Sequence, residues 1–474
     1  MKITLIWPNT PEKSSSLYPP LGLGYIGAIL QSKGYSPEVY DLTFKGAEEK
    51  IPDDSDIYGF SVTTPLSRNA LRLASNIRKK NPRATIIFGG AHLALSPDDI
   101  IRHPAVDIIC IGEGEMTLLD IVQRLEAGQP ICSVPGIAYK EKDGTIKFTE
   151  PRQPTHDLDE LPMPAMDLFP LKSYFEATGI RQLGMLTTRG CPGNCTFCQP
   201  MLRKIFGPTL RFRSAHNILN EITFMVDRHR LDMLMMVDDN FTQNPKNVAA
   251  VCRGMMERGI DVLWRCAGRV ETPRETLALM KKAGCVGICF GVESGSQKIL
   301  DGIQKHVKIK DIRTAFDRCH EIGLLTHAFI MVGNIGEDQT TVQQTMDLIS
   351  EIKPFNINVS ITTPYPGTQL YDHAKRNGLL LSEDWGRYNH ITEDSAGIKL
   401  EKMSPGDVVA AKKKIELFFG EQARSYRHGQ LLKSLDLNML ARLARMSLKD
   451  PSLVFRLLRL RTKIMAQAGF SFFK

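Results

Sequence analysis

Long apolar runs are absent from this chain of 474 residues. No stretch of about 18 consecutive apolar residues occurs, so the sequence predicts no transmembrane helix. The N-terminal Met1–Pro8 reads as a strand, and its apolar run is too short for a signal peptide. Internal repeats and low-complexity tracts are also lacking. With 42% hydrophobic and 24% charged residues, the composition is that of a globular protein with an ample core, and the length predicts several domains.

Most of the chain also lacks a net charge. Glu421–Lys474 holds eleven Lys and Arg residues against three acidic ones, a net of +8 that equals the charge of the whole chain. The first 420 residues are therefore neutral overall. We accordingly expect no nucleic-acid partner for the main body, since non-specific binding of that kind needs a basic surface.

A disulfide framework is not indicated either. Ten cysteines in a long chain without an export signal favour reduced thiols and a reducing cytoplasm. Seven of them are scattered and are expected in the core: Cys110, Cys132, Cys252, Cys266, Cys285, Cys289 and Cys319.

The other three cysteines lie close together. Cys191, Cys195 and Cys198 fall within eight residues, so their thiolates can converge on one metal centre from a single loop. Iron–sulfur clusters are held by such thiolates, and a four-iron cluster with three protein ligands leaves one iron open to a small molecule. A structural zinc loop and buried thiols are the alternatives. Zinc prefers four ligands, however, and no fourth Cys or His lies close in sequence.

The first 127 residues alternate apolar strands with helical patterns. The expected strands are Ile3–Trp7, Pro37–Leu42, Asp56–Val62, Ala84–Gly89 and Val106–Gly112, and the expected helices lie near Leu23–Ser32, Ser67–Lys79 and Glu115–Leu125. This order predicts an α/β domain with a doubly wound parallel sheet, whose ligands bind at the carboxyl ends of the strands. Mostly small or hydroxylated residues collect at those ends: Ser61, Thr63, Thr64, Gly89, Gly90, Gly112 and Glu113.

Residues 128–180 are expected to connect two domains. Gly136–Thr149 alternates around Asp143 and Gly144, which is a hairpin turn signal. A proline-rich stretch follows. We expect it to run along the surface and to fix the relative placing of the two domains.

A second alternation of strands and helices occupies residues 181–385. Its expected strands are Leu183–Thr187, Met233–Val237, Val262–Ala267, Val286–Gly291, Thr326–Met331 and Asn356–Thr362. Six strands in about 180 residues suit a (β/α)6 partial TIM barrel, whose active site belongs at the C-terminal rim. Residues 386–474 are expected to form a helical, basic segment.

Four blocks behind the cysteines stand at strand ends and suit a catalyst. They are Asp238–Phe241, Phe290–Gly295, Met331–Glu337 and Thr362–Thr368. Any one of them is equally typical of an ordinary turn. Their joint order behind the cysteine loop is what indicates a catalytic rim.

The CxxxCxxC spacing, with Phe197 just before the last cysteine, resembles the signature of the radical S-adenosylmethionine (SAM) superfamily. The four blocks are similar in kind and order to those of its barrels over about residues 185–380. The resemblance implies a 4Fe–4S cluster on the three cysteines, with SAM on the open iron. It also implies a set of residues that contact SAM: Phe197, Asp238, Arg265, Arg269, Glu293, Ser294 and Gly333. The fifth-strand loop, Gly333–Gly336, departs from the Gly-x-Pro-Gly turn common in the family.

The first domain resembles the cobalamin-binding domain of one large subclass of that superfamily. The likeness rests on Pro19–Gly24, Gly59–Thr64, Gly89–His92 and Ile111–Glu115. Residues 1–130 contain no Asp-x-His-x-x-Gly motif, so we expect cobalamin without a protein histidine on the cobalt. The seven strand-end residues given above would cradle its nucleotide tail. A sheet that has lost cobalamin and only supports the barrel is the alternative.

Together the two resemblances imply a cobalamin-dependent methyltransferase acting on an unactivated carbon of a small substrate. Oxidative cyclisation or hydroxylation, as in anaerobic porphyrin ring closure, is one alternative. A non-catalytic cobalamin or redox sensor is another. An enzyme of this kind needs a low-potential electron donor such as flavodoxin or ferredoxin.

The basic C-terminal segment combines leucines with arginines. Leu453–Arg461 and Phe470–Phe473 are its most apolar parts. A basic amphipathic helix can lie on the inner face of an anionic membrane, which suits a hydrophobic substrate. The alternative is a helix packed on the barrel with a solvated basic face.

Overall fold

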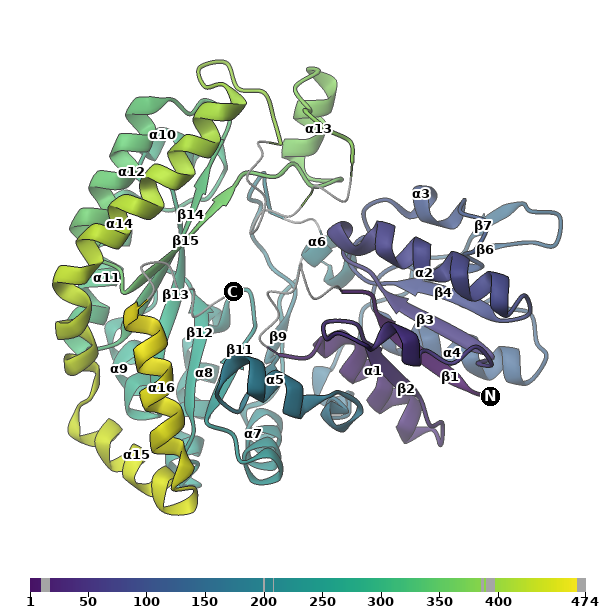
Figure 1. Cartoon of the computed structure of the whole chain (residues 1–474), viewed down its shortest axis with the longest axis horizontal. Coiled ribbons are helices and arrows are strands. Elements are labelled where there is room, and N and C mark those ends of the chain that lie inside the picture. The colour runs from purple at the N-terminus through teal and green to yellow at the C-terminus, as the bar shows by residue number, and fades with distance from the viewer. Residues whose placement is uncertain (10–17, 199–200, 208, 385–387, 389–396, 467–474) are drawn as a thin grey trace.

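The computed structural model describes residues 1–9, 18–198, 201–207, 209–384, 388 and 397–466. Two α/β domains lie side by side, with the N-terminal sheet on the right of Figure 1 and the barrel on the left. Across the described ranges, no helix combines the length and the hydropathy needed to span a bilayer.

The described part of the first domain is built on a sheet in the order β2-β1-β3-β4-β5-β6-β7. Its strands are β1 (Ile3–Trp7), β2 (Glu38–Asp41), β3 (Ile57–Ser61), β4 (Thr85–Gly89), β5 (Ile108–Cys110), β6 (Ile137–Lys140) and β7 (Ile146–Phe148). The first five pair in parallel, which confirms the expected parallel sheet. The hairpin expected in the connector continues this sheet, because β6 pairs antiparallel with β5 at its edge and β7 pairs antiparallel with β6.

Helices cover both faces of this sheet, as a doubly wound fold requires. The helices are α1 (Leu21–Ser32), α2 (Ser67–Lys80), α3 (Pro97–Ile101) and α4 (Glu115–Glu126). Apolar residues of α1 and α4 form one core layer, and those of α2 and α3 form the other. The strand order reverses between β1 and β3, and ligands of such sheets bind at this switch point, beyond the carboxyl ends of the strands.

The second domain holds a sheet of six parallel strands in the order β15-β14-β13-β12-β11-β8. They are β8 (Gln182–Met185), β11 (Met233–Met236), β12 (Leu263–Gly268), β13 (Cys285–Glu293), β14 (Leu325–Val332) and β15 (Asn356–Ile361). All six overlap the strands predicted from the sequence, and their sequential parallel order confirms the half-barrel. Helices follow the strands: α7 (Ala215–His229), α8 (Pro245–Glu257), α9 (Arg274–Lys282), α10 (Gln297–Gly302), α11 (Ile309–Ile322), α12 (Gln339–Ile352) and α13 (Gln369–Arg376).

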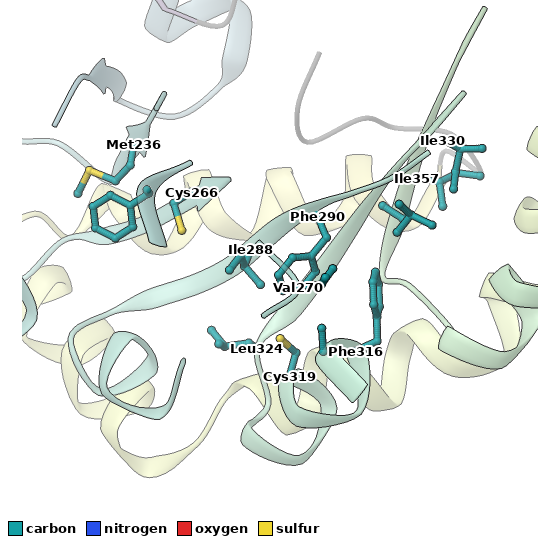
Figure 2. Close-up of a cluster of buried hydrophobic side chains, with 14 of the residues drawn as sticks. Met236, Cys266, Val270, Ile288, Phe290, Phe316, Cys319, Leu324, Ile330 and Ile357 are labelled. Carbon is teal, nitrogen blue, oxygen red and sulfur yellow. The ribbon is translucent and has the colours of Figure 1, made fainter. Parts of the chain in front are cut away.

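The barrel core forms between these strands and their outer helices. In Figure 2, Phe316 and Cys319 of α11 point toward Ile288 and Phe290 of β13. All four side chains are buried, and the rings of Phe290 and Phe316 lie 5.4 Å apart. A packed core of this kind holds the strands, and therefore the rim loops, in fixed positions.

Four shorter elements lie around the entry to the barrel. They are α5 (Leu171–Thr178), β9 (Thr188–Arg189), α6 (Met201–Phe206) and β10 (Arg211–Phe212). Strands β9 and β10 pair as a small antiparallel ribbon, and the cysteine loop lies between them.

The C-terminal segment forms α14 (Pro405–Ser434), α15 (Leu437–Lys449) and α16 (Ser452–Ala466). Helix α14 packs on β14, β15 and α12. Arg445 forms two hydrogen bonds of 2.9 Å with Asp261, and Arg456 pairs with Asp232 at 2.6 Å. Basic side chains thus turn toward acidic groups of the barrel, which favours the packed-helix alternative over a membrane contact. Phe470–Phe473, part of the predicted amphipathic tail, lies outside the described residues.

Candidate functional site

The three clustered cysteines stand on the loop between β9 and α6, at the C-terminal rim of the barrel. All are free thiols and partly exposed. The loop is tied to its surroundings by its backbone, because Thr196 N donates to Ile303 O and Leu370 N donates to Thr196 O, both at 3.0 Å. Burial raises the pKa of the Cys195 thiol, whereas the nearby Lys305 acts to lower it. In the part of the chain that the structure describes, no group of three or more His, Cys, Asp or Glu side chains is arranged to hold a metal ion. Ligation by these cysteines therefore stays a prediction.

Asp238, predicted to contact SAM, holds the strand that leads into the cysteine loop. Its buried carboxylate accepts from the backbone N–H of Thr187 at 2.8 Å and of Thr188 at 2.5 Å. It also accepts from the hydroxyl of Thr187 at 3.0 Å and of Thr188 at 2.7 Å. These four bonds fix the segment that leads from β8 into β9.

Buried Glu293 and half-buried Lys305 form an ion pair at 2.8 Å beside the cysteine loop. Glu293 has a φ of +61°, a left-handed conformation that non-glycine residues hold only when the surroundings enforce it. A Cβ at Gly291 would overlap the Glu293 carboxylate and would lie 2.5 Å from Lys305 Nζ. The absence of a side chain at Gly291 thus makes room for the pair.

The other residues predicted to contact SAM spread around the rim and the interior. Arg269 pairs with Glu271 at 2.7 Å and carries its charge close enough to act on Cys195. Ser294 is buried and accepts from Ser296 N at 3.2 Å, where the chain turns into α10. Arg265 is buried inside the barrel, and burial lowers its pKa to about 10.

Phe197 and Gly333 complete the predicted set. Phe197 is half-buried against the barrel core. Gly333 has a φ of +88°, and its N–H donates to the carboxylate of Glu337. Of the seven predicted residues, Arg269 and Glu293 carry charges that act on the pKa of the Cys195 thiol.

A cavity of about 240 Å³ opens at the carboxyl ends of β1, β3, β4 and β5. Its lining includes five of the seven residues predicted to cradle cobalamin: Ser61, Gly89, Gly90, Gly112 and Glu113. Gly90 has a φ of +101°, and a Cβ there would lie 2.7 Å from the backbone nitrogen of Val62. The backbone can therefore border the cavity only because this residue is glycine.

The two predicted threonines lie outside this lining. Thr63 is half-buried, and Thr64 is buried with its hydroxyl 3.3 Å from Nδ1 of His92. His92 is itself buried, and burial lowers its pKa to about 4. A histidine so placed is a core residue, and the absence of a protein histidine on cobalt stays a prediction.

The cavity is walled on its far side by residues of the barrel domain, above all Arg189 of β9 and Phe206 of α6. Arg189 pairs with Glu115 at 2.5 Å and with Glu113 at 3.3 Å. Arg211 of β10 pairs with Glu113 at 2.6 Å. A network of two carboxylates and two guanidinium groups thus joins the first domain to the strands that flank the cysteine loop.

Sequence reasoning missed Arg189 and Arg211, which the barrel domain contributes to this network. It also missed Lys305. Arg189 stands directly before Gly190 and Cys191, so its position next to the motif was the one available signal. Lys305 lies between Gln304 and His306, both with left-handed φ values, in a stretch without helical or strand periodicity. Neither its partial burial nor its partner Glu293 is indicated by the local pattern.

The residues present fit the cofactors that the resemblance implies. Three thiols on one rim loop are the donor set that iron–sulfur clusters use. A cavity floored by glycine-rich strand ends, with open space at the position of a Gly112 Cβ, fits a ligand that approaches the backbone closely.

Comparisons with known proteins agree with both halves of the structure. The family model of the radical SAM superfamily matches residues 185–349, and that of the B12 binding domain matches residues 12–122. An uncharacterised methyltransferase of Pyrococcus horikoshii is 31% identical over 402 residues, covering 82% of this chain and 87% of the relative. The anaerobic magnesium-protoporphyrin IX monomethyl ester cyclase of Rubrivivax gelatinosus is 26% identical over 410 residues, covering 83% of this chain and 73% of the cyclase.

The fold is also similar to a solved structure. The radical S-adenosylmethionine methyltransferase TsrM of Kitasatospora setae, solved with cobalamin and a [4Fe-4S] cluster bound, superposes with a TM-score of 0.68. The match covers 92% of this chain and 90% of that one at 16% sequence identity. At this identity the likeness concerns the arrangement of the two domains and not the substrate.

Proposed function

This chain belongs to the radical SAM enzymes that carry a cobalamin-binding domain ahead of the barrel, and we propose that it transfers a methyl group from SAM to an unactivated carbon of a small substrate. Its cofactors are a 4Fe–4S cluster, SAM and cobalamin. The P. horikoshii relative, described as a methyltransferase, supports methyl transfer as the leading reaction.

One structural observation carries this proposal. Arg189 lines the cavity at the strand ends of the first domain, and Cys191 follows it two residues later. The candidate cobalamin site and the candidate cluster site therefore face the same interface. A substrate bound between them would lie within reach of both, which a reaction using both cofactors requires.

When bound, the reduced cluster supplies the electron that cleaves SAM to a hydrogen-abstracting radical, and cobalamin serves as the methyl carrier. The chain's own residues position these reagents. Cys191, Cys195 and Cys198 would hold the cluster, while Glu293, Lys305 and Arg269 form the charged wall beside it. Ser61, Gly89, Gly90 and Gly112 would hold the cobalamin tail.

Product analysis tests the reaction. The full chain, reconstituted anaerobically with iron, sulfide and cobalamin and then reduced, should convert SAM to both S-adenosylhomocysteine and 5′-deoxyadenosine. S-adenosylhomocysteine records loss of the methyl group, and 5′-deoxyadenosine records reductive cleavage. Cys195→Ala should retain little iron and form no 5′-deoxyadenosine. Cys132 is expected in the core from the sequence but is exposed in the structure, so Cys132→Ala is the matched control and should behave as the wild type. Formation of neither product by the wild type would contradict the proposal.

Oxidative cyclisation is the second candidate, supported by the similarity to the R. gelatinosus cyclase. The two reactions differ in their SAM products, because a cyclase does not consume the methyl group. Formation of 5′-deoxyadenosine without S-adenosylhomocysteine would therefore favour cyclisation. Both products together favour methyl transfer.

The proposed reaction also determines which partners the protein requires. A small-molecule substrate and a low-potential electron donor such as flavodoxin or ferredoxin are required, and free thiols suit a reducing cytoplasm. We propose no nucleic-acid partner, because the first 420 residues carry no net charge.

A further inference from the structure

We propose that the buried ion-pair network of Glu113, Glu115, Arg189 and Arg211 couples cobalamin binding to cluster assembly, so that each cofactor strengthens the binding of the other. The inference rests on the proposed function, because both cofactors must bind this chain. It assigns a positioning role to four residues that lie between the two candidate sites.

The network joins two loops from different domains. Glu113 and Glu115 lie where β5 leads into α4, at the carboxyl edge of the first sheet. Arg189 lies in β9, and it contacts both carboxylates, at 3.3 Å and 2.5 Å. Arg211 of the paired strand β10 holds Glu113 at 2.6 Å, and Glu113 also accepts from Thr155 N at 2.6 Å.

The network is buried and electrically balanced. The side chains of Arg189, Glu113 and Glu115 are only 6%, 4% and 7% exposed. The guanidinium of Arg189 also lies over the ring of Tyr25 at 5.2 Å and over that of Phe206 at 5.5 Å. Separating such charges in a low-dielectric interior leaves each one unpaired, which is strongly unfavourable. Each loop is therefore stable in its observed place only while the other is in place.

The first-domain side of the network borders the cobalamin cavity directly. Glu113, Glu115 and Arg189 all line it, together with both aromatic rings that flank the guanidinium. A ligand in this cavity therefore contacts the network itself, and binding it favours the arrangement in which Arg189 is engaged.

The barrel side leads to the cysteines through a stiff backbone. Gly190, between Arg189 and Cys191, has a φ of +98°, and a Cβ there would lie 2.5 Å from the Thr209 carbonyl oxygen. Directly before Arg189, the backbone N–H groups of Thr187 and Thr188 donate to the carboxylate of Asp238. These constraints make the segment from Thr187 to Cys191 one short rigid unit, so the position in which Arg189 is engaged is also the position in which Cys191 is presented.

Reciprocity follows from linkage. If cobalamin favours the engaged position of Arg189, and that position places Cys191 for the cluster, then each cofactor raises the affinity of the other by the same factor. Couplings of this kind are typically about 5- to 150-fold.

The test measures binding and not turnover. The dissociation constant of hydroxocobalamin is determined anaerobically for the full chain, with and without its reconstituted cluster. For the wild type we expect the cluster to lower this constant at least about fivefold. In Glu115→Gln, which keeps the shape but not the charge, the ratio should fall toward one while both cofactors still bind.

Tyr174→Phe is the matched control. It removes the 2.5 Å hydrogen bond to Asp41, which joins the first sheet to α5 away from the cavity. Its ratio should stay at the wild-type value. Should Glu115→Gln fail to fold, Glu115→Asp keeps the charge on a shorter side chain and should give an intermediate ratio.

Each outcome is decisive. A wild-type ratio of one, with both cofactors bound, overturns the coupling and leaves the proposed function intact. A wild-type ratio retained by Glu115→Gln, or by Glu115→Asp where that variant replaces it, overturns the role of the network. Failure of cobalamin to bind either form overturns both this inference and the proposed function.

Discussion

Among single residues, Gly291 shows how a missing side chain shapes the site. It leaves the space that the Glu293–Lys305 pair fills. Gly291→Ala should displace the pair and weaken SAM binding by about fivefold or more, since overpacking typically costs about 1–3 kcal/mol. Equilibrium dialysis of SAM against the cluster-loaded enzyme measures the effect. Gly302→Ala meets open space and is the control; equal SAM affinity in the two variants would contradict this role.

Glu337 provides a prediction of pH dependence. Its buried carboxylate accepts from the N–H groups of Gly333 and Asn334, yet burial raises its pKa from 4.5 to about 7. The folded protein therefore binds more protons than the unfolded chain between these values. The free energy of unfolding should then fall as the pH rises from about 4.5 to about 7.

Glu337→Gln isolates this contribution, because glutamine keeps an acceptor and does not titrate. Chemical denaturation at several pH values should show a flatter profile for the variant. The difference from the wild type should be on the order of 3 kcal/mol across the window, since one pKa unit corresponds to about 1.4 kcal/mol. A difference that stays constant with pH would refute the assignment.

Among the structural elements, β9 depends on Asp238. Asp238→Asn replaces one acceptor oxygen by an amide nitrogen, so the bonds from the threonine N–H and hydroxyl groups cannot all persist. We expect a loss of about 1–3 kcal/mol in the free energy of unfolding. Iron should also be lost faster to a chelator, because β9 leads into the cysteine loop. Asp227→Asn, on the exposed face of α7, should change neither measurement.

The C-terminal helices are held on the barrel by buried charge pairs. Arg456 binds both carboxylate oxygens of Asp232, whose side chain is 4% exposed. Arg456→Ala should therefore lower the free energy of unfolding by about 2–3 kcal/mol, because it leaves Asp232 without its guanidinium. Arg459→Ala removes an exposed arginine of the same helix and should have little effect. Similar unfolding curves for the two variants would argue against this docking.

The sequence predicts elements better than their contacts. The strands of both domains lie where apolar runs and turn residues place them, because such signals are local. Arg189 and Glu113 lie far apart in sequence, and nothing near either one identifies the other as its partner. The basic residues of α15 and α16 are a further case: their pattern fits a membrane surface as well as a protein surface, and only the fold brings Asp232 and Asp261 beneath them.

In the molecule as a whole, the candidate site lies at the surface that the two domains share. The first sheet presents its strand ends, and the barrel presents its rim, to a common interface. Residues of both domains line the cavity there, so neither domain forms the complete site by itself. This arrangement suits the proposal that both cofactors act on one substrate.

A joint count of iron and cobalt in anaerobically reconstituted full-length protein tests the central claim most directly. The account predicts about four iron atoms and about one cobalt atom per chain, with the iron lost in Cys195→Ala and retained in Cys132→Ala. Iron without cobalt, after reconstitution with excess cobalamin, would contradict the account.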